Sequence, residues 1–239
     1  MVNSEVNFHK KKDNSTYVHA MFNDIAYKYD LMNDLMTFGL HRLWKQKVSK
    51  LLNVPNKGIV LDLCCGTGDL TSIIVKQFPE SEVIGIDFSE QMLEIADKRR
   101  KKSNVKFIKG DISNLPFEDE SIDGISISFG LRNVSNYRKC LKEIFRISKP
   151  NSRFVILDLS HPKGLWDLLS KIYRFRIVPI IGNLIVGNKS AYEYLPNSIA
   201  NYPNQEELCV MLKDSGWNEI EYFNIFGGVS AIHVAAKIK

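Results

Sequence analysis

The chain has 239 residues, of which 44% are apolar and 25% are charged, as in a water-soluble globular protein. Its 32 basic and 27 acidic residues give a net charge of +5, too small an excess to indicate a nucleic-acid partner. No stretch approaches the roughly 18 to 20 uninterrupted apolar residues that a membrane-spanning helix needs. The length fits one α/β domain with an added segment, and any membrane contact is expected to be peripheral.

Cysteine use and the N-terminal segment indicate a cytoplasmic protein. The four cysteines are Cys64, Cys65, Cys140 and Cys209. They form no C-x-x-C pair and have no histidine at ligand spacing, so we expect reduced thiols and neither a metal site nor a disulfide framework. Residues 1–17 are polar and lack the apolar core of a secretory signal, which predicts a flexible arm.

Residues 18–52 predict a helical cap that precedes the core. Apolar residues such as Phe22 and Ile25 recur at helical spacing, the pattern breaks near Gly39, and a second amphipathic helix is expected over 44–52.

From residue 59 onward, strand and helix patterns alternate, which predicts a parallel sheet covered on both faces. Ligands of such sheets bind at the carboxyl ends of the strands. The predicted strands are 59–63, 83–87, 105–109, 122–128 and 153–158, and the predicted helices are 69–77, 89–101 and 136–148, with a turn at 149–151. A helical lid insertion over 160–205, a helix over 204–215 and strands over 219–225 and 229–237 complete a single domain, 18–239.

The first predicted strand runs into a small-residue loop, Cys64-Cys65-Gly66-Thr67-Gly68, that opens a helix. Glycines remove the Cβ atoms that would keep a ligand away from the backbone. We expect Asp69 or Thr71 to satisfy free amides in the first turn of that helix. The loop therefore predicts a nucleotide-binding site.

Carboxylates near this loop indicate which nucleotide binds. Thr71 stands where the dinucleotide fingerprint has its third glycine, and Asp62 at the end of the strand would repel a pyrophosphate but favour a cationic ligand. Asp87, which ends the second strand, is placed to accept hydrogen bonds from ribose hydroxyls. Together these features favour S-adenosylmethionine, a ribonucleoside that carries a sulfonium and an amino acid.

Two further strand ends carry candidate site residues. Asp111 follows the third strand, where an adenine ring and its amine would pass, although a Gly-Asp pair is also an ordinary turn. The fourth strand ends in Phe129-Gly130-Leu131-Arg132-Asn133-Val134. A polar pair among apolar residues needs a partner if it is buried, so Arg132 and Asn133 are candidate active-site residues.

The chain resembles the ubiquinone and menaquinone biosynthesis C-methyltransferases from about Val18 to its end. The resemblance is carried by four segments: Asp62–Leu70, Phe129–Val134, Tyr29–Asp34 with Gly39–Trp44, and Tyr192–Ile199. It implies a Rossmann-like class I methyltransferase fold, with a seven-stranded, mostly parallel sheet whose last strand is antiparallel. It also implies methylation of a ring carbon of a polyprenylated quinol precursor, leading to menaquinone, ubiquinone or both. The implied donor-site positions are Thr67, Asp87, Asp111, Ile112 and Ser128, beside Asp62, Gly66 and Gly68 from the loop itself.

The expected chemistry places Arg132 against the developing phenolate and Asn133 beside a water or the reacting hydroxyl. Weaker candidates for the acceptor pocket are Tyr29, Asp30, His41 and Tyr194. The catalytic base is not identified. Cys64 and Cys65 replace smaller residues of the family and are expected to narrow the loop.

Three questions stay open at this stage. The basic, apolar segment 165–187 suits a membrane surface, but a helix that merely covers the core has the same pattern. The chain could instead be a non-catalytic donor-binding scaffold of a quinone-synthesis complex, or methylate another acceptor. Whether it forms a homodimer is not determined.

Overall fold

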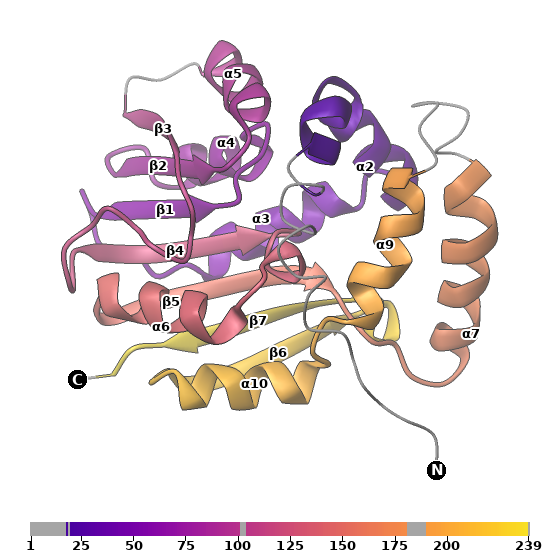
Figure 1. Ribbon diagram of the computed structural model, residues 1–239. Helices are drawn as coiled ribbons and strands as arrows, with labels where there is room; N and C mark the ends of the chain where they lie inside the picture. Colours follow the sequence, from indigo (N-terminus) through magenta and orange to yellow (C-terminus); the bar gives the residue numbers. More distant parts are fainter. Residues whose placement is uncertain (1–17, 19, 101–103, 181–189, 239) are drawn as a thin grey trace.

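The computed structural model describes residues 18, 20–100, 104–180 and 190–238. In this part of the chain, seven strands form one sheet in the order β3-β2-β1-β4-β5-β7-β6 (Figure 1). The strands are β1 (Ile59–Leu63), β2 (Glu82–Asp87), β3 (Val105–Lys109), β4 (Ile122–Ser128), β5 (Ser148–Leu159), β6 (Asn218–Ile225) and β7 (Ser230–Ala236). Strands β1 to β5 run parallel to one another, and β7 runs antiparallel to both β5 and β6. The predicted mostly parallel sheet with an antiparallel last strand is confirmed.

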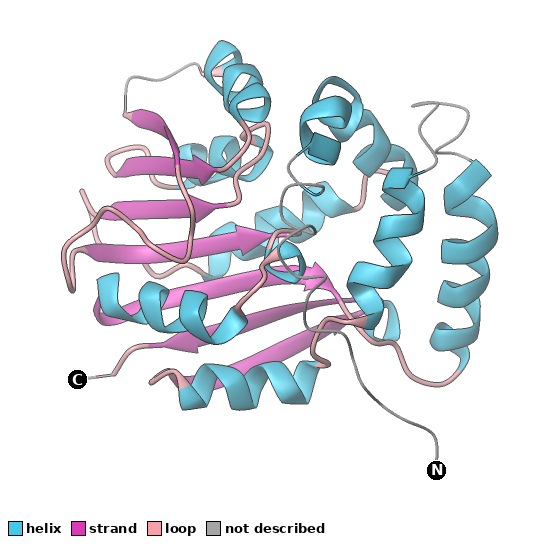
Figure 2. Ribbon diagram, viewed as in Figure 1, coloured by secondary structure: helices cyan, strands magenta, loops and turns pink. Residues whose placement is uncertain are grey.

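Successive residues of the central strands pack into two different cores, which explains why these strands are apolar almost throughout. Val60 lies in one core and Leu61 in the other, and both side chains are fully buried. Helices α6 (Tyr137–Ile147) and α10 (Gln205–Asp214) pack on the face of Leu61, and α3 (His41–Leu51) and α4 (Asp69–Gln77) pack on the face of Val60. Helix α5 (Glu90–Arg99) lies against β2 and β3. Figure 2 shows the resulting arrangement, with helices on both sides of a central sheet.

Cap and lid helices gather beyond the carboxyl ends of the parallel strands (Figure 1). The cap has helical residues at 20–25, the short turn η2 (Ala26–Lys28) and α2 (Tyr29–Thr37). The lid has α7 (Leu165–Ile172), the π-helical turn η4 (Tyr173–Ile177) and α9 (Ser190–Ala200). Met32 and Met36 of α2 pack with Tyr173, Val178 and Leu195 of the lid, so the two segments close over one space. Helices form in both segments, although α3, which belongs to the predicted cap 18–52, packs on the sheet, and residues 181–189 of the predicted lid lie outside the described residues.

The turn predicted at 149–151 is wrong. Residues 148–151 belong to β5, which begins at Ser148 rather than at residue 153. The turn-forming residues produce an irregularity within the strand: Asn151 has a φ of 67°, and the register to β4 shifts between the pairs Ile122–Ser148 and Gly124–Arg153. The break in the helix predicted from these residues is observed, since α6 ends at Ile147, but pairing along the sheet includes them in the strand.

Candidate active site

The donor loop, residues 64–68 between β1 and α4, is shaped by two glycines in the left-handed region. Gly66 has a φ of 54° and Gly68 a φ of 78°. A Cβ on Gly68 would lie 3.1 Å from Ala96 and 3.2 Å from Phe107, so this glycine allows α5 and β3 to approach closely. A Cβ on Gly66 would be in ordinary van der Waals contact with Tyr29 and Met92 of the described residues, at 3.9 and 4.0 Å. The backbone at Gly66 is therefore not crowded, which a loop that binds a cofactor requires.

Asp62 lies beneath this loop and supports it. Its side chain is buried and accepts hydrogen bonds from Thr71 Oγ1 at 2.6 Å and Ser126 Oγ at 3.0 Å. Burial raises the pKa of Asp62 to about 6, although the two hydrogen bonds act in the opposite direction. The structure thus gives Asp62 a place under the donor loop rather than on its open surface.

Asp87, at the end of β2, links the two neighbouring strand ends. Its Oδ2 accepts from the Gly66 N–H at 2.8 Å, and its Oδ1 accepts from the Ser89 N–H at 2.9 Å. A carboxylate oxygen can accept more than one hydrogen bond, so Asp87 can hold the loop and still receive a hydroxyl.

The remaining predicted donor residues lie at the neighbouring strand ends. Asp111 follows β3 with an exposed side chain, and its Oδ1 accepts from the Ser113 N–H at 2.8 Å. Ile112 is buried beside it, and Ser128 ends β4 with a buried hydroxyl that has no hydrogen-bond partner among the described residues. A buried hydroxyl without a partner is unusual in a folded protein, and a hydrogen bond to a ligand would satisfy it.

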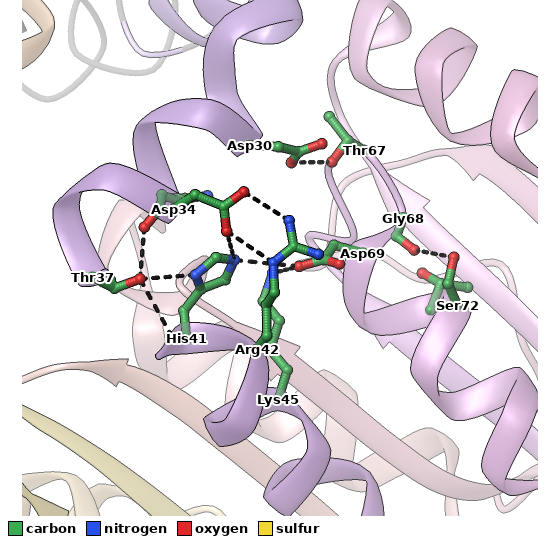
Figure 3. Close-up of polar contacts among 12 residues, drawn as sticks. Asp30, Asp34, Thr37, His41, Arg42, Lys45, Thr67, Gly68, Asp69 and Ser72 are labelled. Carbon is green, nitrogen blue, oxygen red and sulfur yellow. Dashed lines mark hydrogen bonds and ion pairs between the residues drawn. The ribbon is translucent and has the colours of Figure 1, made fainter. Parts of the chain in front are cut away.

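The cap and α3 contact the donor loop and the start of α4 through a hydrogen bond and ion pairs (Figure 3). Thr67 Oγ1 donates to Asp30 Oδ1 at 2.7 Å, and Asp30 also pairs with Arg99. Asp69, the first residue of α4, receives Lys45 Nζ at 2.9 Å and faces His41 Nε2 at 3.5 Å.

These contacts correct the predicted start of α4. Among the described residues no side chain caps the helix; Asp69 instead pairs with Lys45 of α3, and Thr71 donates to Asp62. Burial raises the pKa of Asp69, but the hydrogen bond from His41 and the charge of Lys45 outweigh it and hold the pKa well below its usual value.

His41 is buried within this cluster, which is not the acceptor-pocket position considered from the sequence. The Thr37 hydroxyl donates to the Asn33 carbonyl at 2.6 Å, so His41 Nδ1, 2.8 Å away, donates to Thr37 Oγ1. Its other nitrogen faces Asp69 and Asp34. Both ring nitrogens are therefore engaged between the cap and α4.

Arg132 and Asn133 lie in the short turn η3 (Leu131–Asn133), directly after β4. Arg132 Nη1 donates to Asp158 Oδ1 at 2.7 Å and to the Phe129 carbonyl at 2.6 Å, while its backbone N–H donates to Asp158 Oδ2 at 3.1 Å. Burial lowers the pKa of Arg132, but the charge of Asp158 more than compensates and the pKa is raised. Asn133 Oδ1 accepts from the Tyr194 hydroxyl at 3.0 Å, so the lid orients the side chain of Asn133.

A cavity of about 160 Å³ opens between cap, lid and strand ends. Its wall is mostly apolar, with polar groups from Tyr29, Arg132 and Tyr194. Apolar side chains in its wall come from the cap (Phe22, Ile25, Met32, Met36), from the residue after β4 (Phe129) and from the lid (Val178, Leu195, Ile199). Tyr29 lines this cavity, and a Cβ built on Gly66 would lie 3.9 Å from its ring, so Tyr29 lies between the cavity and the donor loop.

The structure thus brings Arg132, Tyr29 and Tyr194 to one cavity, while Asp30 and His41 contact the donor loop and α4. The sequence did not predict that Asp158 is the partner of Arg132. The one feature that could have indicated it is that Asp158 is an acidic residue at the end of an apolar strand. The sequence also did not predict the pairing of Lys45, whose ammonium is almost fully buried against Asp69. Cys64 and Cys65 are free thiols whose pKa values burial raises far above the usual range.

Comparison with known proteins identifies the family. A family model described as the ubiE/COQ5 methyltransferase family matches residues 10–237. The chain belongs to the ubiE/COQ5 methyltransferase family. A Rickettsia prowazekii protein named ubiquinone/menaquinone biosynthesis C-methyltransferase UbiE is 42% identical over 231 residues, which cover 92% of each chain. A Staphylococcus aureus protein named demethylmenaquinone methyltransferase is 40% identical over 231 residues, which cover 95% of this chain and 96% of that protein.

Solved structures support the fold of this ubiE/COQ5 family member. A Thermotoga maritima protein described as an SAM-dependent methyltransferase, possible histamine N-methyltransferase, has a TM-score of 0.66 at 20% identity, covering 91% of this chain and 99% of that one. A chain from a Haloferax volcanii complex of the Trm112 methyltransferase activator and a putative methyltransferase has a TM-score of 0.69 at 16% identity, covering 91% of this chain and 98% of that one. The predicted Rossmann-like methyltransferase fold and the assignment as a methyltransferase are confirmed.

The residues at this site fit S-adenosylmethionine. Gly66 leaves room for a ligand against the backbone, Asp87 has accepting capacity beside it, and the Ser128 hydroxyl has no protein partner among the described residues. Residues Gly66, Gly68, Asp87, Asp111 and Ser128 together surround the carboxyl ends of four adjacent strands, where α/β sheets bind nucleosides.

Proposed function

We propose that this methyltransferase transfers a methyl group from S-adenosylmethionine to a ring carbon of a polyprenylated quinol precursor of menaquinone, ubiquinone or both. The observation that carries the proposal is a mostly apolar cavity that is separated from the donor loop by Tyr29. Apolar walls suit an aromatic ring with an isoprenoid tail. The names of the relatives at 42% and 40% identity support the same acceptor class.

The donor would supply a methyl carbon bonded to a positively charged sulfur, so that methylation joins this carbon to the ring, leaves the methyl–sulfur electron pair on sulfur and releases one proton. The protein must therefore make the ring carbon electron-rich and align it with the methyl group. Loss of the neighbouring phenolic proton places electron density on that carbon, so stabilising a phenolate is the main chemical task.

Arg132 is suited to stabilise the phenolate, because Asp158 and the Phe129 carbonyl hold its Nη1 while its Nε has no hydrogen-bond partner among the described residues. A fixed guanidinium in a water-poor cavity stabilises an anion without first reorganising. Asn133 is not among the residues that line the cavity, but it accepts from the Tyr194 hydroxyl, which does line it; through this contact Asn133 would help to position the hydroxyl or a water that carries its proton away.

We also propose reversible contact with a membrane surface, through which a lipid-borne acceptor reaches the cavity. The outer side of α7 and η4 exposes the large apolar side chains of Leu165, Leu168, Leu169, Ile172 and Phe175. Lys171 and Arg176 lie beside them, and Tyr173 and Arg174 of the same segment line the cavity. Apolar residues flanked by basic ones suit an anionic bilayer surface. The remainder of the segment considered from the sequence, 181–187, lies outside the described residues, and no helix in the described ranges could span a membrane.

Flotation with anionic vesicles tests this contact. Leu169→Glu is expected to leave protein at the bottom of the gradient, whereas Val210→Glu, at an exposed apolar position on α10, is expected to float like the parent protein. Equal flotation of both variants would contradict an attachment through α7.

The function is tested by incubating the protein with methyl-labelled S-adenosylmethionine and, separately, demethylmenaquinol or the demethylated ubiquinol precursor, followed by mass spectrometry of the lipid extract. Label in one quinone identifies the acceptor. Donor binding without label in either would favour another acceptor or a scaffold role. Arg132→Ala is expected to depress turnover far more than donor affinity; an equal loss of both would contradict its proposed role.

A further inference from the structure

The strand order predicts how the donor lies across the site. Asp111, Asp87 and the donor loop follow β3, β2 and β1, which are adjacent in that order. Neighbouring strands are about 5 Å apart. With the adenine near Asp111 and the ribose near Asp87, the amino-acid end of the donor reaches the loop after β1 and points toward β4. That end carries an ammonium group, which needs an acceptor, preferably with negative charge.

Two adjacent cap residues reach this part of the loop. Asp30 of α2 accepts from Thr67 Oγ1 at 2.7 Å, and the adjacent Tyr29 borders Gly66. The side chain of Asp30 is 23% exposed, and its ionic partner Arg99 is 51% exposed. Each carboxylate oxygen of Asp30 can accept a further hydrogen bond.

Among the other nearby carboxylates, Asp87 already accepts from two backbone N–H groups and is assigned to the ribose, and three more are engaged by other groups. Asp69 is paired with the buried Lys45, and Asp34 with Arg42 through two hydrogen bonds. Asp62 is buried beneath the loop.

We propose that Asp30 is the counter-charge for the ammonium group of S-adenosylmethionine, so that the cap completes the donor site. This rests on the proposed use of that donor. Thr67 assists because its only hydroxyl proton is committed to Asp30, which leaves its lone pairs to accept from the ammonium. Asp30 acts as a donor-site residue, in place of the acceptor-pocket role considered from the sequence.

Calorimetry with two ligands tests the proposal: S-adenosylhomocysteine, and its analogue in which the amino group is replaced by hydrogen. Asp30→Asn keeps an acceptor for Thr67 but removes the charge. Since a hydrogen bond to a charged group contributes about tenfold or more to binding, Asp30→Asn is expected to reduce the preference for the amino-bearing ligand about tenfold. Affinity for the desamino analogue should change little.

Two variants serve as controls. Asp24→Asn removes an exposed carboxylate from the same cap and should preserve the preference. Arg99→Gln frees Asp30 from its ion pair and should preserve or increase it. The proposal is overturned if Asp30→Asn leaves the preference intact, or if Asp24→Asn reduces it equally. Failure of the parent protein to bind S-adenosylhomocysteine would instead refute the donor assignment itself.

Discussion

Replacing Asp158 by asparagine tests whether a buried ion pair fixes the proposed catalytic arginine. The side chains of Arg132 and Asp158 are 8% and 2% exposed, and the carboxylate receives both the guanidinium and the backbone N–H of Arg132. The amide of the Asp158→Asn variant could still accept one hydrogen bond but would leave the guanidinium charge unpaired. Removing one partner of a buried pair costs about 3 to 5 kcal/mol, and the retained hydrogen bond places the expected loss near the lower value.

The assay is equilibrium unfolding by urea, with thermal unfolding beside it. A loss of about 3 kcal/mol corresponds to a fall of roughly 6 to 12 °C in the unfolding temperature of a domain of this size. Turnover should fall as well, because Arg132 loses its anchor, while affinity for S-adenosylhomocysteine should be preserved.

The matched control is Asp119→Asn, which breaks the exposed pair between Asp119 and Arg146 and should cost less than about 1 kcal/mol. A double variant, Arg132→Met with Asp158→Leu, should be more stable than Asp158→Asn because it buries no unpaired charge. If Asp158→Asn costs no more than Asp119→Asn, the loss of Asp158 leaves no uncompensated buried charge and the reasoning is refuted.

Three further predictions concern the donor loop and the pH dependence of stability. Gly66→Ala and Gly39→Ala introduce a side chain at a φ of 54° and 73° respectively, so each should lower the free energy of unfolding in urea by about 1 kcal/mol. Only Gly66→Ala should weaken the binding of S-adenosylhomocysteine, measured by calorimetry. Equal weakening of binding by both variants would contradict a donor loop at Gly66. Burial raises the pKa of Asp62 to about 6 from 3.8, so the folded state binds the proton more tightly than the unfolded state. The free energy of unfolding should therefore fall as the pH rises from 3.8 through about 6. Asp62→Asn should remove that loss, measured by unfolding at pH 4 and pH 7. Burial lowers the pKa of His233 to about 4 from 6.5, so the neutral imidazole contributes to stability above pH 6.5, and this contribution is lost as the pH falls toward 4. His233→Gln should reduce this loss of stability in acid. An unchanged pH profile of stability in the variant would contradict the lowered pKa.

Much of the fold could be predicted because it is specified by neighbouring residues. Apolar runs that end in glycine or an acid give β1, β2 and the donor loop, and their alternation with helices gives the parallel sheet. The position of Arg132 and Asn133 at a strand end followed in the same way, since carboxyl ends of parallel strands share one edge. The turn predicted at 149–151 failed because strand pairing outweighed a local preference.

The partners of the site residues could not be predicted in this way. Asp158 is 26 positions from Arg132, Asp30 is 37 positions from Thr67, and Lys45 is 24 positions from Asp69. Each pair joins different elements, so it forms only where the sheet order and the cap bring those elements together.

The sequence by itself determined the donor loop, the alternating architecture and the family, because periodicity, glycine positions and short motifs are properties of adjacent residues. Only the tertiary structure decided that Asp62 lies under the loop, that His41 joins the cap to α4, and that cap and lid enclose an apolar cavity beside Arg132. Burial and charge pairing depend on the distances between elements far apart in the chain, and those distances are set by packing of the whole domain.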